Sequence, residues 1–180
     1  MSRTLKLVIC AMLIALDIVF ARFLSVTPGG LSRISLQFLP DAMMGAVLGP
    51  LWGLAGCAAA DVLGMLLNSQ GLAYTPLFTL SAAVRGLLYG LMLTRVKGGI
   101  GRKTLFAVLS VAIVVDLGMN PLWLIFYYGN LSYPAVLSSK IVTEAFVFPV
   151  KWAVLATIYR YLMPQINRIL HISPAKEENL

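Results

Sequence analysis

Apolar residues fall into six long stretches along this chain, separated by short segments rich in Gly, Pro, Ser and charged residues. The predicted spans are residues 5–24, 36–48, 51–67, 76–93, 104–127 and 134–163. A helix that crosses a bilayer needs about 20 mostly apolar residues. The pattern therefore predicts an all-α, polytopic membrane protein with six transmembrane helices. Residues 1–180 are expected to form a single integral membrane domain.

The breaks between these stretches carry the residues that end helices. Gly49-Pro50 closes the second stretch, and Pro76 opens the fourth. The segment 25–35 is the most turn-rich loop, and a basic loop at 97–103 precedes the fifth stretch. The N-terminal stretch begins like a signal peptide, but Arg22 interrupts it and more spans follow. It is expected to be retained as the first span.

Composition supports the same class. Hydrophobic residues make up 59% of the chain and charged residues 12%, whereas soluble domains contain about 45–50% and about 25%. Most of the surface must therefore face lipid. Six spans use nearly all of the length, so a soluble catalytic or nucleotide-binding domain is not expected. The remaining classes are transport, membrane-embedded binding, intramembrane catalysis and membrane assembly.

The net charge of +7 reflects orientation, because the basic residues lie at the ends of the apolar stretches. With the N-terminus inside, nine of the 14 Lys and Arg residues fall on the cytoplasmic side and three on the outer side. This asymmetry predicts that both termini are cytoplasmic and that the number of spans is even. A nucleic-acid-binding surface is not indicated.

Charged residues inside the spans are the candidates for function, because each costs at least about 2.5–3.5 kcal/mol at the bilayer centre. They are Asp17, Asp41, Asp61, Arg85, Asp116, Glu144 and Lys151. Helical spacing groups polar and aromatic residues on three faces: Phe78, Ser81, Arg85 and Tyr89; Asp116, Asn120, Trp123 and Tyr127; and Lys140, Glu144, Phe148 and Lys151.

Two interpretations of these faces stay open. In the first, buried ion pairs lock the bundle. In the second, aromatic rings and a few convergent polar groups line a small-molecule pocket, and such a pocket suits a flat, polar, anionic ligand. Asp61 is expected to contact the ligand or to pair with Arg85.

Catalysis has little support in the sequence. The single histidine, His171, lies in the tail, and Cys10 and Cys57 lack metal-ligand spacing. The loop at 98–104 is not a phosphate-binding loop, because Arg102 stands where a glycine is required. No catalytic residue, metal or cofactor is expected. An intramembrane enzyme using an Asp61/Asp116 pair and a purely structural bundle subunit remain as alternatives.

Small residues four apart allow helix backbones to approach closely in a membrane. The pattern occurs at Ala11/Ala15, Gly45/Gly49, Gly49/Gly53 and Ala82/Gly86/Gly90. Packing within the bundle explains most such pairs. Ala11 and Ala15, on the first span, are the best candidates for docking to a separate membrane partner.

Specific motifs extend this interpretation. The segment I-x-LQFLPDAMMGAVLGPLWGLAGCAAADVLGMLL, followed by YTPLFTLSAAVRGLLYGLML, resembles the substrate-binding S components of energy-coupling factor (ECF) transporters. The folate-specific type is the most similar. The resemblance rests on Ala11 and Ala15, FLP at 38–40, GPLWG at 49–53, ADVLG at 60–64 and FTLSAAVRGLLYG at 78–90.

The resemblance implies a six-span vitamin binder in a bacterial plasma membrane. It implies partners as well: a membrane coupling subunit that meets the Ala11/Ala15 face, and two ATPases. The loop 25–35 would gate a pocket in the outer half of the bundle. Folate is the expected vitamin, with another vitamin as the alternative. The substrate-binding residues expected from depth, face and resemblance are Arg33, Gln37, Asp61, Tyr74, Phe78, Thr79, Ser81, Arg85, Asn120, Trp123, Lys140 and Glu144.

Overall fold

The computed structural model describes residues 2–25, 35–69, 74–129 and 132–169, and every regular element in these ranges is a helix. The all-α prediction is confirmed. The elements are α1 (Arg3–Arg22), α2 (Phe38–Met43), η2 (Met44–Leu48), α3 (Pro50–Leu67), α4 (Pro76–Arg95), α5 (Ile100–Val111), η3 (Ala112–Met119), α6 (Asn120–Tyr128) and α7 (Tyr133–Ile169), where η denotes a π-helical turn.

These elements form six helical segments that match the six predicted spans, because α2 continues into η2 and α5 continues through η3 into α6. Five of the segments are long and apolar enough to cross a membrane. The second is shorter: α2 has six residues and η2 five. At 1.5 Å per residue it extends about 16 Å, roughly half of a hydrocarbon core.

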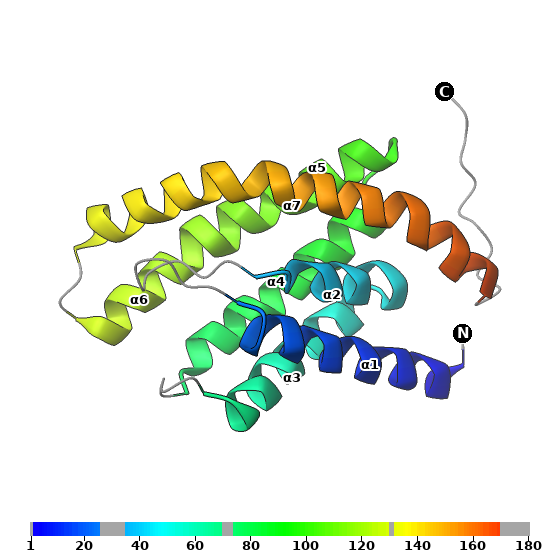
Figure 1. Ribbon diagram of the computed structural model, residues 1–180, viewed down its shortest axis with the longest axis horizontal. Helices are drawn as coiled ribbons and strands as arrows, with labels where there is room; N and C mark the ends of the chain where they lie inside the picture. Colours follow the sequence, from blue (N-terminus) through cyan, green and yellow to red (C-terminus); the bar gives the residue numbers. More distant parts are fainter. Residues whose placement is uncertain (1, 26–34, 70–73, 130–131, 170–180) are drawn as a thin grey trace.

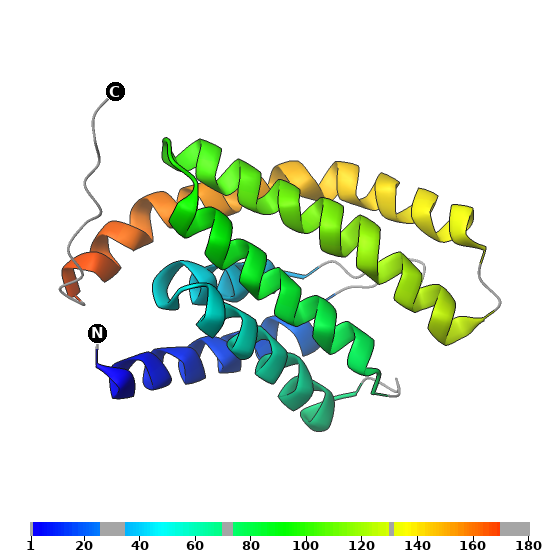
Figure 2. The same cartoon turned by 180° about the vertical axis from the view of Figure 1, so that it is seen from behind.

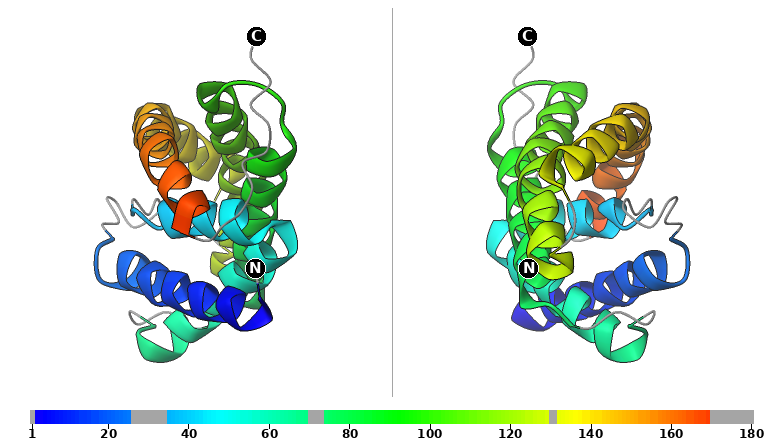
Figure 3. Two further views of the ribbon diagram at one scale, coloured as in Figure 1. Left: turned by 90° about the vertical axis from the view of Figure 1, so that its right-hand side faces the viewer. Right: turned by 90° about the vertical axis from the view of Figure 1, so that its left-hand side faces the viewer.

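The helices surround this short segment. In Figure 1, α7 runs along the α5–η3–α6 rod, and α1 lies on the other side of the molecule. Figure 2 shows α4 crossing the back, where it packs against α3. Seen end-on in Figure 3, α2 lies between α1 and α7. The start of α1 and the end of α7 lie at the same end of the bundle, as an even number of spans requires.

Glycines permit the tightest helix contacts. A Cβ atom on Gly53 would lie 2.6 Å from the carbonyl oxygen of Gly86, and one on Gly45 would lie 2.5 Å from the backbone nitrogen of Gly90. Both distances are too short for any side chain. The small-residue pattern at these four positions therefore serves packing inside the bundle, where α4 meets α3 and η2.

Both π-helical turns lie next to a proline. Pro50 follows η2 across Gly49, whose φ of 94° ends the helix in a conformation that glycine tolerates best. Pro121 follows η3 and has no N–H to donate to the preceding turn. A widened turn accommodates the missing hydrogen bond, and such turns occur often at functional sites.

Candidate functional site

The interior of the bundle holds two groups of charged side chains, and the first joins α2, α3 and α4. Arg85 Nε on α4 lies 2.6 Å from Asp41 Oδ2 on α2, and the Asp41 side chain is fully buried. The thiol of Cys57 on α3 donates to Asp41 Oδ1 across 3.1 Å. The short second segment is thus anchored to its neighbours by a buried ion pair.

Asp61 lies nearer the outer end of α3 and bridges α1 and α4. Its carboxylate accepts hydrogen bonds from Thr79 Oγ1 at 2.7 Å and from Arg22 Nη2 at 3.4 Å. Thr79 Oγ1 also lies 3.1 Å from the Tyr74 hydroxyl. The alternative that Asp61 pairs with Arg85 is wrong. The carboxylate that α2 presents to Arg85 is that of Asp41, whereas Asp61 faces Arg22 at the end of α1.

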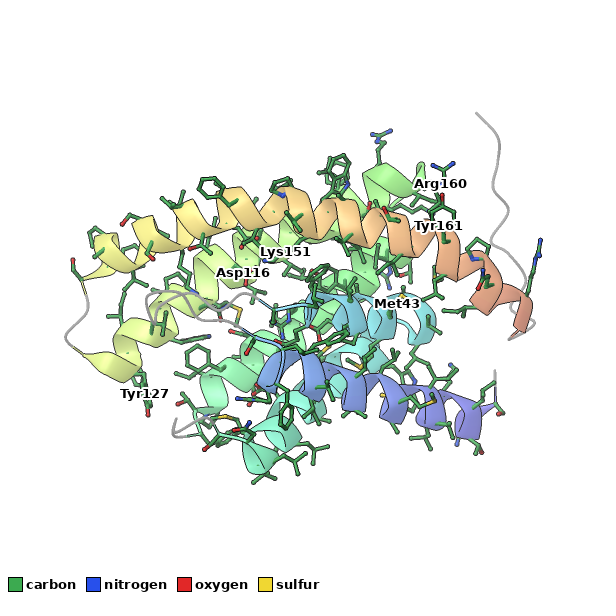
Figure 4. The ribbon with its side chains drawn as sticks, in the orientation of Figure 1. Met43, Asp116, Tyr127, Lys151, Arg160 and Tyr161 are labelled. Carbon is green, nitrogen blue, oxygen red and sulfur yellow. The ribbon has the colours of Figure 1, made fainter. Side chains whose placement is uncertain are left out.

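The second charged group joins the α5–η3–α6 rod to α7. Lys151 Nζ lies 3.0 Å from Asp116 Oδ2 and 2.8 Å from Glu144 Oε1. Figure 4 shows Asp116 and Lys151 between the two long helices, pointing toward each other. Asn120 Nδ2 donates to Asp116 Oδ1 across 3.4 Å. Lys140 lies near enough to interact electrostatically with both acids.

An aromatic contact lies between these two groups. The indole N–H of Trp123 on α6 donates to the hydroxyl of Ser81 on α4 across 2.9 Å. Ser81 is buried, and Trp123 and Phe78 are half-buried. The predicted faces of the fourth, fifth and sixth spans therefore do converge in the bundle, and they carry an aromatic ring beside polar donors.

Several predicted residues lie elsewhere or at the margin. Gln37, at the start of α2, lies within hydrogen-bonding reach of the Asp17 carboxylate. Ala11 and Ala15 are exposed on α1. Tyr74 is half exposed at the outer end of the bundle. Arg33 lies outside the residues that the structure describes.

Ion pairing in the interior is extensive, as the first interpretation of the charged faces expected. Sequence reasoning singled out Asp41, Asp116 and Lys151 as charges inside spans but did not place them in the site. It counted Arg22 at the end of the first span only among the basic residues of the outer side. The four-residue spacing from the apolar Ile18 to Arg22 was the available signal, because it places both on one face of the same helix, and both are buried.

One hollow near this region has a volume of about 170 Å³. It is lined by Val62, Met65, Leu66, Ser69 and Tyr74. Small-molecule sites usually measure about 300–1,000 Å³. This hollow is too small and too apolar for a polar vitamin, so the candidate site is defined by the converging side chains instead.

The aspartate pair proposed for an intramembrane enzyme does not form among the described contacts. Asp61 pairs with Arg22, and Asp116 pairs with Lys151. A carboxylate dyad that activates water needs both carboxyl groups at one position. The two aspartates lie at different contacts between helices, so the intramembrane enzyme has no geometric support.

The sequence profile of the family described as "ECF-type riboflavin transporter, S component" matches residues 1–166. The chain therefore belongs to the S component family of ECF-type transporters. Members of such a family, with several apolar helices, are multi-pass proteins of the bacterial plasma membrane, and this chain is one. The chain is therefore, by class, a subunit of a membrane transporter.

Similar proteins with more specific names were also found. A folate transporter FolT of Clostridium novyi (strain NT) is 39% identical over 152 residues, covering 83% of this chain and 85% of the relative. A folate transporter FolT of Streptococcus mutans serotype c is 30% identical over 170 residues, covering 91% of this chain and 88% of the relative.

A solved structure is similar throughout most of the fold. The crystal structure of FolT bound with folic acid matches with a TM-score of 0.75 and 32% sequence identity. The match covers 83% of this chain and 88% of that chain. The arrangement of helices seen here is therefore that of a solved S component.

Proposed function

We propose that this chain is the folate-binding S component of an ECF-type importer and that residues 1–180 act as one substrate-binding domain. The observation that carries the proposal is the similarity over most of the chain to a FolT structure that contains folic acid. The relatives named as folate transporters support it independently. The chain would bind the vitamin from outside and deliver it through other subunits.

The chemistry of the converging faces suits folate. Trp123 and Phe78 offer stacking surfaces for a flat heterocycle, and Asn120 and Asp61 offer hydrogen bonds to its edge. Lys140 on α7, together with Arg33 in the proposed gate loop 25–35, would attract the carboxylates of the glutamate tail. Six further residues complete the proposed pocket or position the side chains that contact the ligand: Gln37, Tyr74, Thr79, Ser81, Arg85 and Glu144.

The energy for uptake would come from partner subunits. Ala11 and Ala15 are small, exposed and one turn apart on α1, so a helix of a membrane coupling subunit can approach the α1 backbone closely there. Two ATPase subunits would bind to that coupling subunit. In this arrangement the chain itself is a binding subunit and not an enzyme.

The test is ligand binding by the purified chain in detergent, without ATP. Folate at 100-fold excess over its dissociation constant should add about 2.7 kcal/mol to the free energy of unfolding, which a thermal shift detects. Riboflavin and thiamine are the comparison ligands. Riboflavin is included because the matching family profile carries its name.

Each result separates the alternatives. Stabilisation by folate alone supports the proposal, and stabilisation by riboflavin or thiamine alone identifies an S component for another vitamin. ATP hydrolysis by the isolated chain above background would contradict a purely binding role. Uptake into cells should appear only when the partner subunits are co-expressed.

A further inference from the structure

Helix α1 carries a buried acid that differs from the other acids of the interior. The Asp17 side chain is 1% exposed, and its Oδ1 has no hydrogen-bond partner. Asp41, Asp61, Asp116 and Glu144 each form an ion pair with an Arg or Lys. Asp17 forms no such pair among the described residues. An unpaired carboxylate in this position needs a positive partner.

The charges around Asp17 do not balance. Three acids and two bases meet where α1, α2, α3 and α4 pack together: Asp17, Asp41 and Asp61 with Arg22 and Arg85. The neighbouring group is balanced, because Asp116 and Glu144 face Lys140 and Lys151. The full sequence has no further acid between residues 1 and 169. Among the described residues, the interior therefore carries one excess negative charge if every group is ionised.

A cation must offset this charge, since an uncompensated charge in the membrane interior is costly. A metal ion needs several ligands, and the described residues contain no group of three or more His, Cys, Asp or Glu side chains placed to hold one. A proton needs one oxygen atom. The unpartnered Oδ1 of Asp17 is the available position.

We propose that Asp17 is a proton-binding site inside the bundle and that it carries a bound proton at neutral pH. The charged and titratable groups that face it are Asp41 from α2, Cys57 and Asp61 from α3 and Arg85 from α4, and Arg22 of α1 itself pairs with Asp61. Asp41, on the adjacent α2, is a fully buried carboxylate close enough to interact electrostatically with Asp17. Loss of the proton would leave the buried carboxylates of Asp17 and Asp41 both negatively charged, and they would repel each other across the α1–α2 contact.

Protonation of Asp17 is therefore linked to the packing of α1 against its neighbouring helices. Ala11 and Ala15 lie on the exposed side of this helix, and Asp17 lies on its buried side. Protonation keeps α1 against α2 and α3, and deprotonation weakens that contact. This inference holds whichever vitamin the chain binds.

The experiment is an infrared titration of the purified full-length chain in lipid nanodiscs. At pH 7 we expect the C=O stretching band of a protonated carboxylic acid. Asp17→Asn should remove this band, whereas Asp17→Glu should shift it. Glu144→Gln is the matched control, because Glu144 is ion-paired with Lys151 in the neighbouring group and does not face Asp17, and it should leave the band unchanged.

Stability provides a second measurement. The folded chain would hold one more proton than the unfolded chain, so its unfolding equilibrium constant should rise with pH, by up to about tenfold per unit. Asp17→Asn, whose amide replaces the protonated acid, should fold and show a flatter profile. Absence of the band in the wild-type chain at pH 7 overturns the proposal, as does a band that Asp17→Glu does not shift. The glutamate variant decides the matter even if Asp17→Asn fails to fold.

Discussion

Trp123 donates its indole N–H to the Ser81 hydroxyl across 2.9 Å, and this contact joins α6 to α4 in the middle of the candidate site. The hydrogen bond thereby fixes the orientation of the ring. Both residues were expected in the site from their helical faces. Their pairing is a tertiary contact across 42 positions, which the sequence pattern could not provide.

Replacing Trp123 by Ala should weaken folate binding at least tenfold. The variant loses the stacking surface and leaves the buried Ser81 hydroxyl without its partner, which together cost about 1–3 kcal/mol. Titration of folate into the purified variant measures the effect. Trp152→Ala is the matched control, because Trp152 is exposed and donates to Gly101 near the other end of the bundle. It should retain normal affinity.

Asn120→Ala should also weaken folate binding at least tenfold. The side chain is half-buried beside Asp116, so its amide is the polar edge that α6 presents to the bundle. Ser110→Ala, which removes only a hydroxyl bonded to its own helix, serves as the control. Normal affinity in both the Asn120 and Trp123 variants would place the ligand on another face of this helix.

Lys151→Met should destabilise the bundle by about 3–5 kcal/mol, because it leaves Asp116 and Glu144 as neighbouring buried acids without their shared cation. This change is measured by denaturing the purified protein in mild detergent and recording the loss of its monodisperse peak. Adding Glu144→Gln to Lys151→Met should recover part of the stability. A double variant less stable than the single variant would contradict the charge argument.

Gly86→Ala should lower stability by about 1–3 kcal/mol, because the added methyl group meets the backbone of Gly53. The thermal midpoint of the purified protein reports the loss. Gly101→Ala is the control in α5, where an added Cβ meets nothing within 4 Å. It should stabilise the helix slightly. Equal midpoints for the two variants would show that the α3–α4 contact can relax.

Replacing Ala11 and Ala15 together by Trp should reduce assembly with the coupling subunit and uptake, while folate binding by the isolated chain stays near normal. The bulky rings would hold a partner helix away from the α1 backbone. Co-purification from a membrane that contains all subunits tests this. Ala145→Trp, an exposed position on α7, is the control. Joint loss of binding and assembly would mean that the pair serves internal packing.

The sequence predicted the number, order and bounds of the helical segments closely, because the apolar stretches and their Gly and Pro boundaries are local signals. For the same reason it predicted much of the inward faces of the fourth, fifth and sixth segments, although Tyr127 at the end of the fifth face is exposed. It did not predict that Asp41 rather than Asp61 pairs with Arg85. That outcome depends on where the short α2 segment sits between α1, α3 and α4, which is a matter of tertiary packing.

The π-helical turns were likewise not predicted. Pro50 and Pro121 were visible, but a proline can end a helix, kink it or widen the preceding turn. The choice depends on what packs against the helix. One helix that packs against η3 is α7, and its Lys151 forms an ion pair with Asp116 in the widened turn.

The ion pair between Asp41 and Arg85 also has a consequence for biogenesis. Arg85 leaves the ribosome 44 residues after Asp41, a delay of about 2–9 s at ordinary rates of synthesis. During that interval Asp41 lies on a segment too short to cross the bilayer, and its cation does not yet exist. The α2 segment must therefore wait at the insertion machinery or the membrane surface until α4 arrives. Membrane entry of this chain is then cooperative between helices and cannot proceed one span at a time.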